Sequence, residues 1–172
     1  DMALLSLDTG MRRGEVFSLT WQDIDFKNDI IQIKDTKSNR NRQAFMTKQV
    51  KEMLKTRKKS GGGVGHIFQN KNGGGIHHVY KVFDRTVEAL GFNKGLKDTR
   101  DRVVFHTLRH TFASWLAVNG TPLLTIKELG GWQSLDMVER YAHLVPDQKR
   151  EAIKKLEEKK LLDGNVYKVA TS

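Results

Sequence analysis

The chain has 172 residues, with 30 Lys and Arg against 20 Asp and Glu, which gives a net charge of +10. This length supports one domain with a real core, and a hydrophobic content of 38% is typical of a soluble globular protein. No window approaches the ~20 apolar residues of a membrane span, and no signal-peptide pattern opens the chain. The lack of cysteine excludes a disulfide scaffold, thiol catalysis and thiolate metal sites, and it agrees with a cytoplasmic location.

Basic residues are concentrated in one stretch of the chain. Residues 34–59 hold ten Lys and Arg and only two acids, Asp35 and Glu52. A basic excess of this kind is the electrostatic footprint of a nucleic-acid binder, although a solvated surface explains it equally well. Charge alone therefore leaves both interpretations open.

The first half of the chain switches between helical and strand-like patterns. Residues 1–8 resemble the end of a helix, and because the chain starts with Asp1 we interpret it as a fragment whose first helix is truncated. A short helix is expected over 12–20. The stretches 24–26, 30–34 and 43–46 predict a small three-stranded antiparallel sheet at one edge, with a long basic hairpin loop before the third strand. Thr47 is the expected N-cap of the next helix.

The second half is predicted to be mostly helical. A basic, glycine-rich loop at 58–65 precedes a short strand at 67–68 and a turn at 71–75, and neither glycine cluster has the ending of a nucleotide P-loop. Helical spacing then predicts the helices 77–90, 106–119, 122–129, 134–142 and 146–160, with a charged linker at 91–103. We therefore expect one α+β domain over 1–172, mostly helical, that ends in a C-terminal helix and tail at 147–172.

Polar residues suited to a phosphate lie in separate segments of the chain. They are Arg12, Lys37, the pair His106 and Arg109, and Tyr141. The pair stands three residues apart on a predicted helix, so both side chains share one face. Taken singly, each residue has an ordinary interpretation as a surface charge, a solvated loop residue or a core side chain.

The same helix also offers a pair of potential metal ligands. His106 and His110 are spaced one turn apart, as in zinc sites. The glutamate of the zinc-protease motif is missing, and no carboxylate cluster supplies further ligands. The sequence therefore predicts no metal and no cofactor.

The order of these segments carries a family resemblance. Thr-Gly-Met-Arg-x-x-Glu begins at Thr9, a lysine follows in a β-hairpin, and His-x-x-Arg-His begins at His106. Leu-Gly-Gly-Trp then begins at Leu129, and Tyr-Ala-His begins at Tyr141. Over about residues 3–146 the chain resembles the catalytic domain of tyrosine recombinases, the phage-integrase family. The resemblance implies a site-specific recombinase of a mobile element that cleaves and rejoins DNA without a metal, through a 3′-phosphotyrosine and a free 5′-hydroxyl.

The resemblance also implies a role for each matching residue. The catalytic set it implies is Arg12, Lys37, His106, Arg109, Trp132 and Tyr141. The two arginines hold the phosphate, since a planar guanidinium matches two phosphate oxygens and stays charged. Tyr141 is the nucleophile, and because a phenol of pKa about 10 is only about 0.1% ionised at neutral pH, it needs a proton acceptor, which is His106.

The remaining roles concern the leaving group and the supporting residues. The departing 5′-hydroxyl needs a general acid, for which Lys37 matches the hairpin lysine, with Lys34, Arg40 and Arg42 as rivals. Trp132 stands where family members carry histidine or tryptophan, and it contacts the phosphate. The glutamate three residues after Arg12 braces that arginine.

Partners and competing functions follow from the same resemblance. The expected partner is double-stranded DNA at a specific recombination site, bound by a tetramer of the full-length protein, whereas this fragment is expected to be monomeric alone and to lack the N-terminal DNA-clamping domain. The C-terminal helix docks either on a neighbouring subunit or on its own domain. The expected location is the cytoplasm of a bacterium or phage host, at the nucleoid. A type IB topoisomerase, which rejoins the same strand, and a catalytically silent DNA-binding module are the alternatives.

Overall fold

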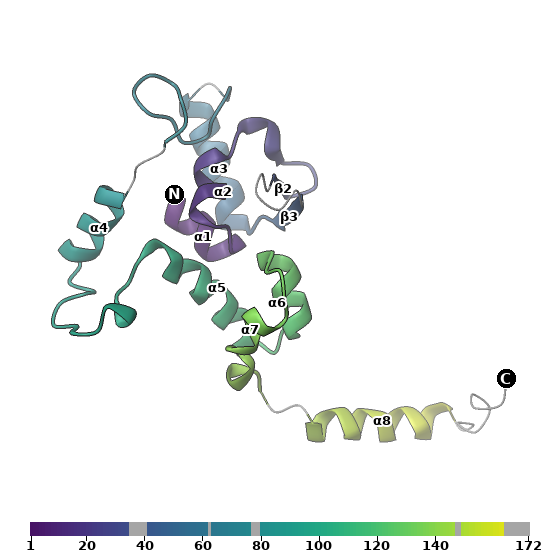
Figure 1. The fold of residues 1–172 in the computed structure, drawn as a ribbon. Coiled ribbons are helices and arrows are strands. Elements are labelled where there is room, and N and C mark those ends of the chain that lie inside the picture. Colours follow the sequence, from purple (N-terminus) through teal and green to yellow (C-terminus); the bar gives the residue numbers. More distant parts are fainter. Residues whose placement is uncertain (35–40, 62, 77–79, 147–148, 164–172) are drawn as a thin grey trace.

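A computed structural model describes residues 1–34, 41–61, 63–76, 80–146 and 149–163 (Figure 1). The sequence-predicted class, α+β and mostly helical with one small sheet, is confirmed. The elements in chain order are α1 (Met2–Thr9), α2 (Arg13–Ser18), η1 (Trp21–Asp23), β1 (Ile24–Asp25), β2 (Ile30–Ile33), β3 (Arg42–Phe45), α3 (Lys48–Gly61), α4 (Tyr80–Ala89), η2 (Thr99–Asp101), α5 (Phe105–Val118), α6 (Leu123–Gly130), α7 (Asp136–Glu139), η3 (Ala142–Leu144) and α8 (Lys149–Asp163).

The sheet has the predicted antiparallel order β1-β2-β3. Ile31 and Ile33 of β2 are buried while Gln32 between them is exposed, because successive side chains of a strand point to opposite faces. The buried face joins α1, α2 and α3 in one hydrophobic core. Thr47 accepts a hydrogen bond from the N–H of Val50 at 3.2 Å, as its predicted capping role requires. The hairpin segment 35–40, which contains Lys37, lies outside the described residues.

The end of α1 is shaped by a close approach to α5. Gly10 ends α1 in the left-handed region at φ 64°, where L side chains are strained. A Cβ atom there would lie 2.6 Å from Cδ1 of Phe112 on α5, so the two helices meet only because this position is glycine. Ser6 Oγ donates to Met11 O at 2.9 Å and fixes the turn that follows. The carbonyl of Gly10 is thereby presented to α5.

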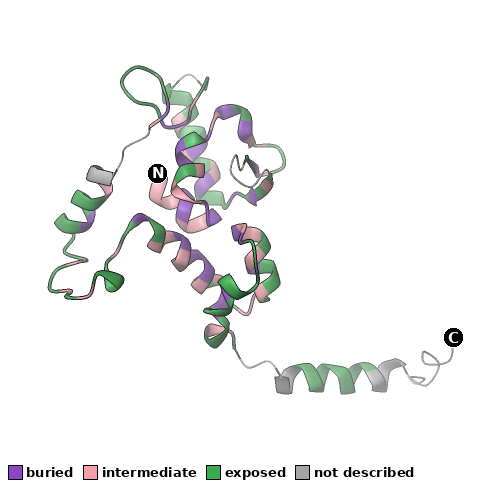
Figure 2. Cartoon of the chain, viewed as in Figure 1, coloured by how far each residue is buried: buried purple, intermediate pink, exposed green. Residues whose placement is uncertain are grey.

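A second core lies among α5, α6 and α7. Ala113, Ala117, Ile126 and Val138 are fully buried in it, and the two alanines on α5 let α6 approach closely. Figure 2 shows buried residues both in the group formed by α1, α2 and α3 and in the group formed by α5, α6 and α7. The contact of α1 with α5 joins the two cores.

One predicted loop and one predicted strand differ from the observed elements. The segment 58–65 is not all loop, because α3 continues to Gly61. The strand expected at 67–68 is wrong, because in the described part of the chain this segment has only the isolated bridges Thr20↔His66 and Gln69↔Gly75 on either side of it. Both apolar side chains at 67–68 are nevertheless buried in the first core. The hydrophobic pattern predicted their burial correctly. A run of two apolar residues, however, cannot distinguish a strand from a buried bend.

The helix predicted over 134–142 is also wrong. Only one turn, Asp136–Glu139, is α-helical. The N–H of Tyr141 donates to Val138 O at 2.9 Å, and the N–H of Leu144 donates to Tyr141 O at 3.0 Å, so the chain continues with tight three-residue turns. Tyr141 therefore lies at the junction of two short turns rather than inside a regular helix.

Helix α4 packs on α5, whereas α8 lies apart from both cores (Figure 1). α8 lies near the C-terminus and apart from the other helices in Figure 1, and the described side chains at 152–159 are exposed (Figure 2). Phe83 of α4 contacts Phe105 of α5 at a centroid distance of 5.3 Å. No helix within the described ranges is both long and apolar enough to cross a membrane.

Candidate active site

Three arginines are gathered at the C-terminus of α6. Consecutive carbonyl oxygens there each accept a hydrogen bond from a different arginine. The pairs are Arg42 Nη1 with Leu129 O (2.8 Å), Arg109 Nη1 with Gly130 O (2.6 Å) and Arg12 Nη2 with Gly131 O (2.7 Å). The last carbonyls of a helix lack intrahelical partners and carry partial negative charge, so they attract cations. The end of α6 thus aligns three guanidinium groups that come from distant parts of the sequence.

Glu15 joins two of these arginines. Its carboxylate accepts from Arg12 N at 2.6 Å and from Arg12 Nη1 at 3.0 Å, and it accepts from Arg42 Nη2 at 2.8 Å. The side chain is only 8% exposed, so these charge-assisted hydrogen bonds are shielded from water. Glu15 is therefore placed to brace Arg12, as the sequence suggested, and it holds Arg42 as well.

Arg109 is a buried cation with unused donors. It is 1% exposed, and its Nη1 also donates to Gly10 O at 2.5 Å. Its Nε and Nη2 have no hydrogen-bond partner among the residues that the structure describes. Burial, followed by repulsion from Arg12 and Arg42, lowers the pKa of Arg109 to about 9, so the group still carries its charge at neutral pH. Buried donors of this kind call for an acceptor, and an anion suits a buried cation best.

The Gly130-Gly131-Trp132 segment is one packing unit. The indole of Trp132 occupies the space where a side chain at Gly130 would be, since a Cβ there would lie 1.8 Å from its Cζ3 atom. The guanidinium carbon of Arg109 lies 4.0 Å from the indole centroid, in a cation–π contact. The indole also contacts the ring of Tyr141 at a centroid distance of 6.2 Å. Trp132 therefore packs between the buried arginine and the predicted nucleophile.

This packing predicts the effect of Gly130→Ala. We expect the free energy of unfolding to fall by about 1–3 kcal/mol, because the added methyl group must displace the indole. Thermal unfolding of the purified variant measures the loss. Gly61→Ala is the matched control, since its Cβ would meet nothing within 4 Å. Equal melting temperatures for the two variants would contradict the observed packing.

Tyr141 is buried and its hydroxyl group has a defined partner. The side chain is 5% exposed, and the hydroxyl forms a hydrogen bond with Nδ1 of His110. Burial raises the pKa of Tyr141, while the nearby cations Arg140 and Arg109 act in the opposite direction. The phenol is thus protonated at neutral pH and needs a base before it can attack.

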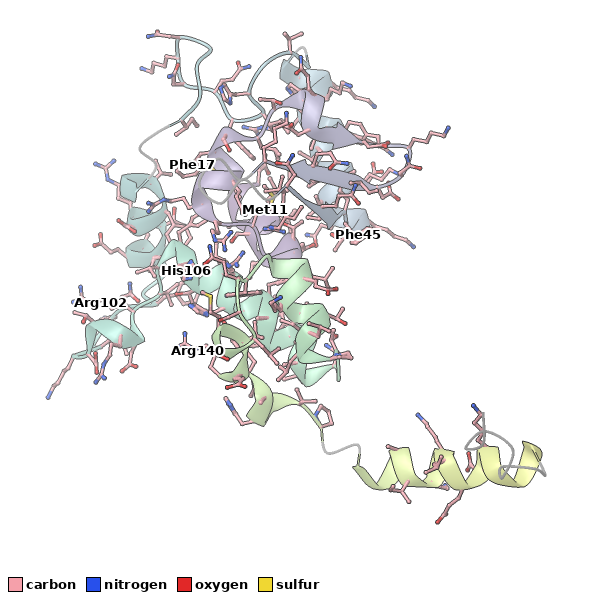
Figure 3. All side chains as sticks on the ribbon, turned by 45° about the vertical axis from the view of Figure 1, so that its right-hand side comes forward. Met11, Phe17, Phe45, Arg102, His106 and Arg140 are labelled. Carbon is pink, nitrogen blue, oxygen red and sulfur yellow. The ribbon has the colours of Figure 1, made fainter. Side chains whose placement is uncertain are left out.

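His106 lies at the opening of the site. It is exposed, and its ring is perpendicular to that of His110 at a centroid distance of 4.7 Å. Partial burial, then repulsion from Arg109 and Arg12, lowers the pKa of His106. Figure 3 shows His106 on α5, and it lines a cleft of about 510 Å³ together with Arg12. No hydrogen bond joins His106 to Tyr141 within the described part of the chain.

The structure brings most of the sequence-predicted set together. Its described members are Arg12, His106, Arg109, Trp132 and Tyr141. Lys37 lies outside the described residues, as does its rival Arg40. Another rival, Lys34, instead forms an ion pair with Asp23 at 2.7 Å.

Sequence reasoning assigned no catalytic role to two residues that belong to this cluster. The sequence offers Arg42 only as a rival for the hairpin lysine, and no sequence signal distinguishes it from its basic neighbours. His110 follows Arg109 directly and lies one helical turn after His106, and this spacing was the available signal. No group of three or more His, Cys, Asp or Glu that could hold a metal occurs among the described residues.

Arginines held in place next to a buried tyrosine are typical of a site that binds a phosphate group. Comparison with known proteins identifies the family. Residues 1–148 match the phage integrase family, and the chain belongs to this family. It is 32% identical to the integrase of Salmonella phage P22 over 161 residues, which is 88% of this chain and 41% of that protein. It is also 32% identical to tyrosine recombinase XerA of Saccharolobus solfataricus over 146 residues, 85% of this chain and 46% of that protein.

The fold agrees with this assignment. The solved catalytic domain of bacteriophage HP1 integrase superposes with a TM-score of 0.67 and 29% identity, over 89% of this chain and 79% of that domain. The architecture is therefore that of a tyrosine recombinase catalytic domain. The chain spans less than half the length of the two curated relatives above.

Proposed function

We propose that this chain is the catalytic domain of a site-specific DNA recombinase or integrase. Membership of the phage integrase family supports this function. The single observation that carries it is Arg109, whose buried Nε and Nη2 donors lack a partner in the described residues beside a buried tyrosine. A DNA phosphate supplies the missing acceptor oxygens and the missing negative charge.

In this proposal the arginines act on the phosphate. Attack on phosphorus builds negative charge on the non-bridging oxygens, and fixed donors aimed at that charge lower the barrier. Arg109 is held by two carbonyls and Arg12 by Glu15 and Gly131 O, so neither group has to reorganise during the reaction. His106, beside Arg12 in the cleft, contributes a further hydrogen bond to the same phosphate.

The chemical step conserves the energy of the DNA backbone. The Tyr141 oxygen attacks phosphorus, the bond to the 5′ oxygen breaks, and a 3′-phosphotyrosine with a free 5′-hydroxyl results. The 5′ oxygen receives a proton from a general acid, for which we retain Lys37 as the candidate. The tyrosine proton passes to one of the two neighbouring histidines. A hydroxyl from another strand reverses the step and completes the exchange without a metal.

The partner in this proposal is double-stranded DNA. A net charge of +10 favours association with phosphate backbones, and the affinity should fall steeply with salt. The full-length protein acts as a tetramer on a specific site, whereas this chain alone is a monomer. The reaction takes place at the nucleoid of the host cell.

Strand transfer is the experiment that tests this function. The DNA site is first isolated by binding selection with the full-length protein, and a nicked duplex with that site is then incubated with a second, labelled duplex. We expect a covalent DNA–protein adduct followed by joining to the second duplex. Relaxation of supercoiled DNA without transfer would indicate a type IB topoisomerase instead. Binding with no adduct would indicate a silent DNA-binding module.

A further inference from the structure

Two histidines lie near the nucleophile, and only one of them touches its reacting atom. His110 Nδ1 is hydrogen-bonded to the Tyr141 hydroxyl, whereas His106 contacts the ring of His110 from the side and faces the cleft. Both histidines come from α5, one helical turn apart. They therefore share a face of the helix, but His110 contacts the nucleophile whereas His106 faces the cleft.

We propose that His110 is the catalytic base that accepts the proton of Tyr141, and that His106 serves the phosphate instead. The assignment deepens the proposed function and rests on it. A proton acceptor must lie within hydrogen-bond reach of the proton it removes, and this contact satisfies the requirement before DNA binds. Nδ1 of His110 accepts in the tautomer that carries its proton on Nε2.

The surroundings of His110 keep it ready to accept a proton. The charged or titratable groups against it are His106 and Arg109 on its own helix, and Arg140 and Tyr141 from the turn after α7. Burial, followed by repulsion from His106 and then Arg140, lowers the pKa of His110 below its ordinary value of 6.5. His110 is therefore neutral at pH 7, which is the form a base requires.

Each atom in the step is accounted for. The Tyr141 proton moves to His110 Nδ1, the phenolate oxygen forms the bond to phosphorus, and the bond from phosphorus to the 5′ oxygen breaks. The 5′ oxygen takes its proton from the general acid. On rejoining, a 5′-hydroxyl returns its proton to the general acid and attacks phosphorus. The bond from phosphorus to the Tyr141 oxygen breaks, and that oxygen recovers its proton from His110.

The test substitutes the base without removing the hydrogen bond. The carbonyl oxygen of His110→Asn takes the place of Nδ1 as an acceptor but cannot carry a proton. We expect adduct formation on the selected nicked site to fall by about 10²–10⁴-fold at pH 7. We also expect its pH profile to change between about pH 7.5 and 8.5, well above the ordinary histidine pKa of 6.5. The parent rate should be flat there, because His110 is already neutral, whereas the variant rate should rise with pH as more tyrosinate forms.

Control variants identify which histidine accepts the proton of Tyr141. His106→Asn should slow cleavage but keep the flat profile, and His143→Asn, at an exposed position two residues after Tyr141, should behave like the parent. A flat profile and near-parental rate for His110→Asn would overturn the assignment, as would a rising profile confined to His106→Asn.

A second variant covers the case in which His110→Asn does not fold. A ring-fluorinated histidine at position 110 has nearly the same shape and is a weaker base, so the rate should fall while the melting temperature stays the same. An unchanged rate would contradict the inference. If the parent protein forms an adduct on Tyr141 but the variants at position 110 behave like the parent, the role of His110 is refuted and the proposed function stands. If the parent forms no adduct, both fall.

Discussion

Tyr141→Phe is expected to abolish covalent attachment to DNA. The expected fall in the rate of adduct formation is more than about 10⁴-fold, the scale on which loss of a nucleophile acts in covalent catalysis. The phenylalanine ring retains the packing against Trp132, so the loss reflects the missing oxygen rather than a disrupted core. Gel separation of denatured DNA–protein adducts measures the effect.

The sequence offers a matched control for this variant. The chain has three tyrosines, at positions 80, 141 and 167, so Tyr80→Phe makes the same chemical change elsewhere. It should form adducts at the parental rate, and both variants should bind the DNA site with equal affinity. Undiminished adducts with Tyr141→Phe would show that the nucleophile has been assigned to the wrong residue.

Arg109→Lys should also slow the reaction strongly. We expect cleavage to slow by about 10²–10³-fold, the usual cost of losing one fixed donor to a transition-state charge. Lysine keeps the positive charge but lacks the planar group that reaches two carbonyls, stacks on Trp132 and offers Nε and Nη2 to the phosphate. Single-turnover cleavage at saturating DNA separates this loss from any change in binding.

A surface arginine provides the comparison for Arg109. The side chain of Arg100 is 87% exposed, and its ion pair is with its neighbour Asp98. Arg100→Lys should cleave at the parental rate under saturating DNA. If Arg109→Lys cleaves as fast as this control, the buried guanidinium has no role in the chemical step. A melting temperature for each variant shows whether a slow rate reflects unfolding.

The C-terminus of α6 explains how distant residues become one site. Arg12, Arg42 and Arg109 are separated from their carbonyl partners by 119, 87 and 21 positions along the chain. Those partners are nevertheless three consecutive residues, 129–131, at the end of the helix. Gly130 leaves room for the indole that supports Arg109, and Gly131 ends the helix at φ 70°. The segment is therefore a structural template for the cationic site as well as a family motif.

Much of this site was predictable because its residues keep a motif order and spacing. Arg12, His106, Arg109, Trp132 and Tyr141 were all identified from sequence and lie in one cluster. The sheet and most helices were also predictable, since their apolar positions follow periods of two or about 3.6 residues.

Features that depend on three-dimensional contacts were not predictable. Periodicity predicts only local structure. It therefore cannot show that Arg42 donates a hydrogen bond to Leu129 O, which lies 87 positions away in the sequence. The sequence shows that His110 lies one helical turn after His106. The contact of His110 with the Tyr141 hydroxyl, however, depends on the short turns after Val138. The same tight turns explain why a longer helix was wrongly expected there.

Mapping the covalent adduct shows which residue attacks the DNA. The protein is trapped on a nicked duplex that carries the selected site, digested with protease and nuclease, and the modified peptide is sequenced by mass spectrometry. We expect a nucleotide joined through its 3′ phosphate to Tyr141, with a free 5′-hydroxyl on the released strand. Attachment to another residue, or linkage through a 5′ phosphate, would contradict it.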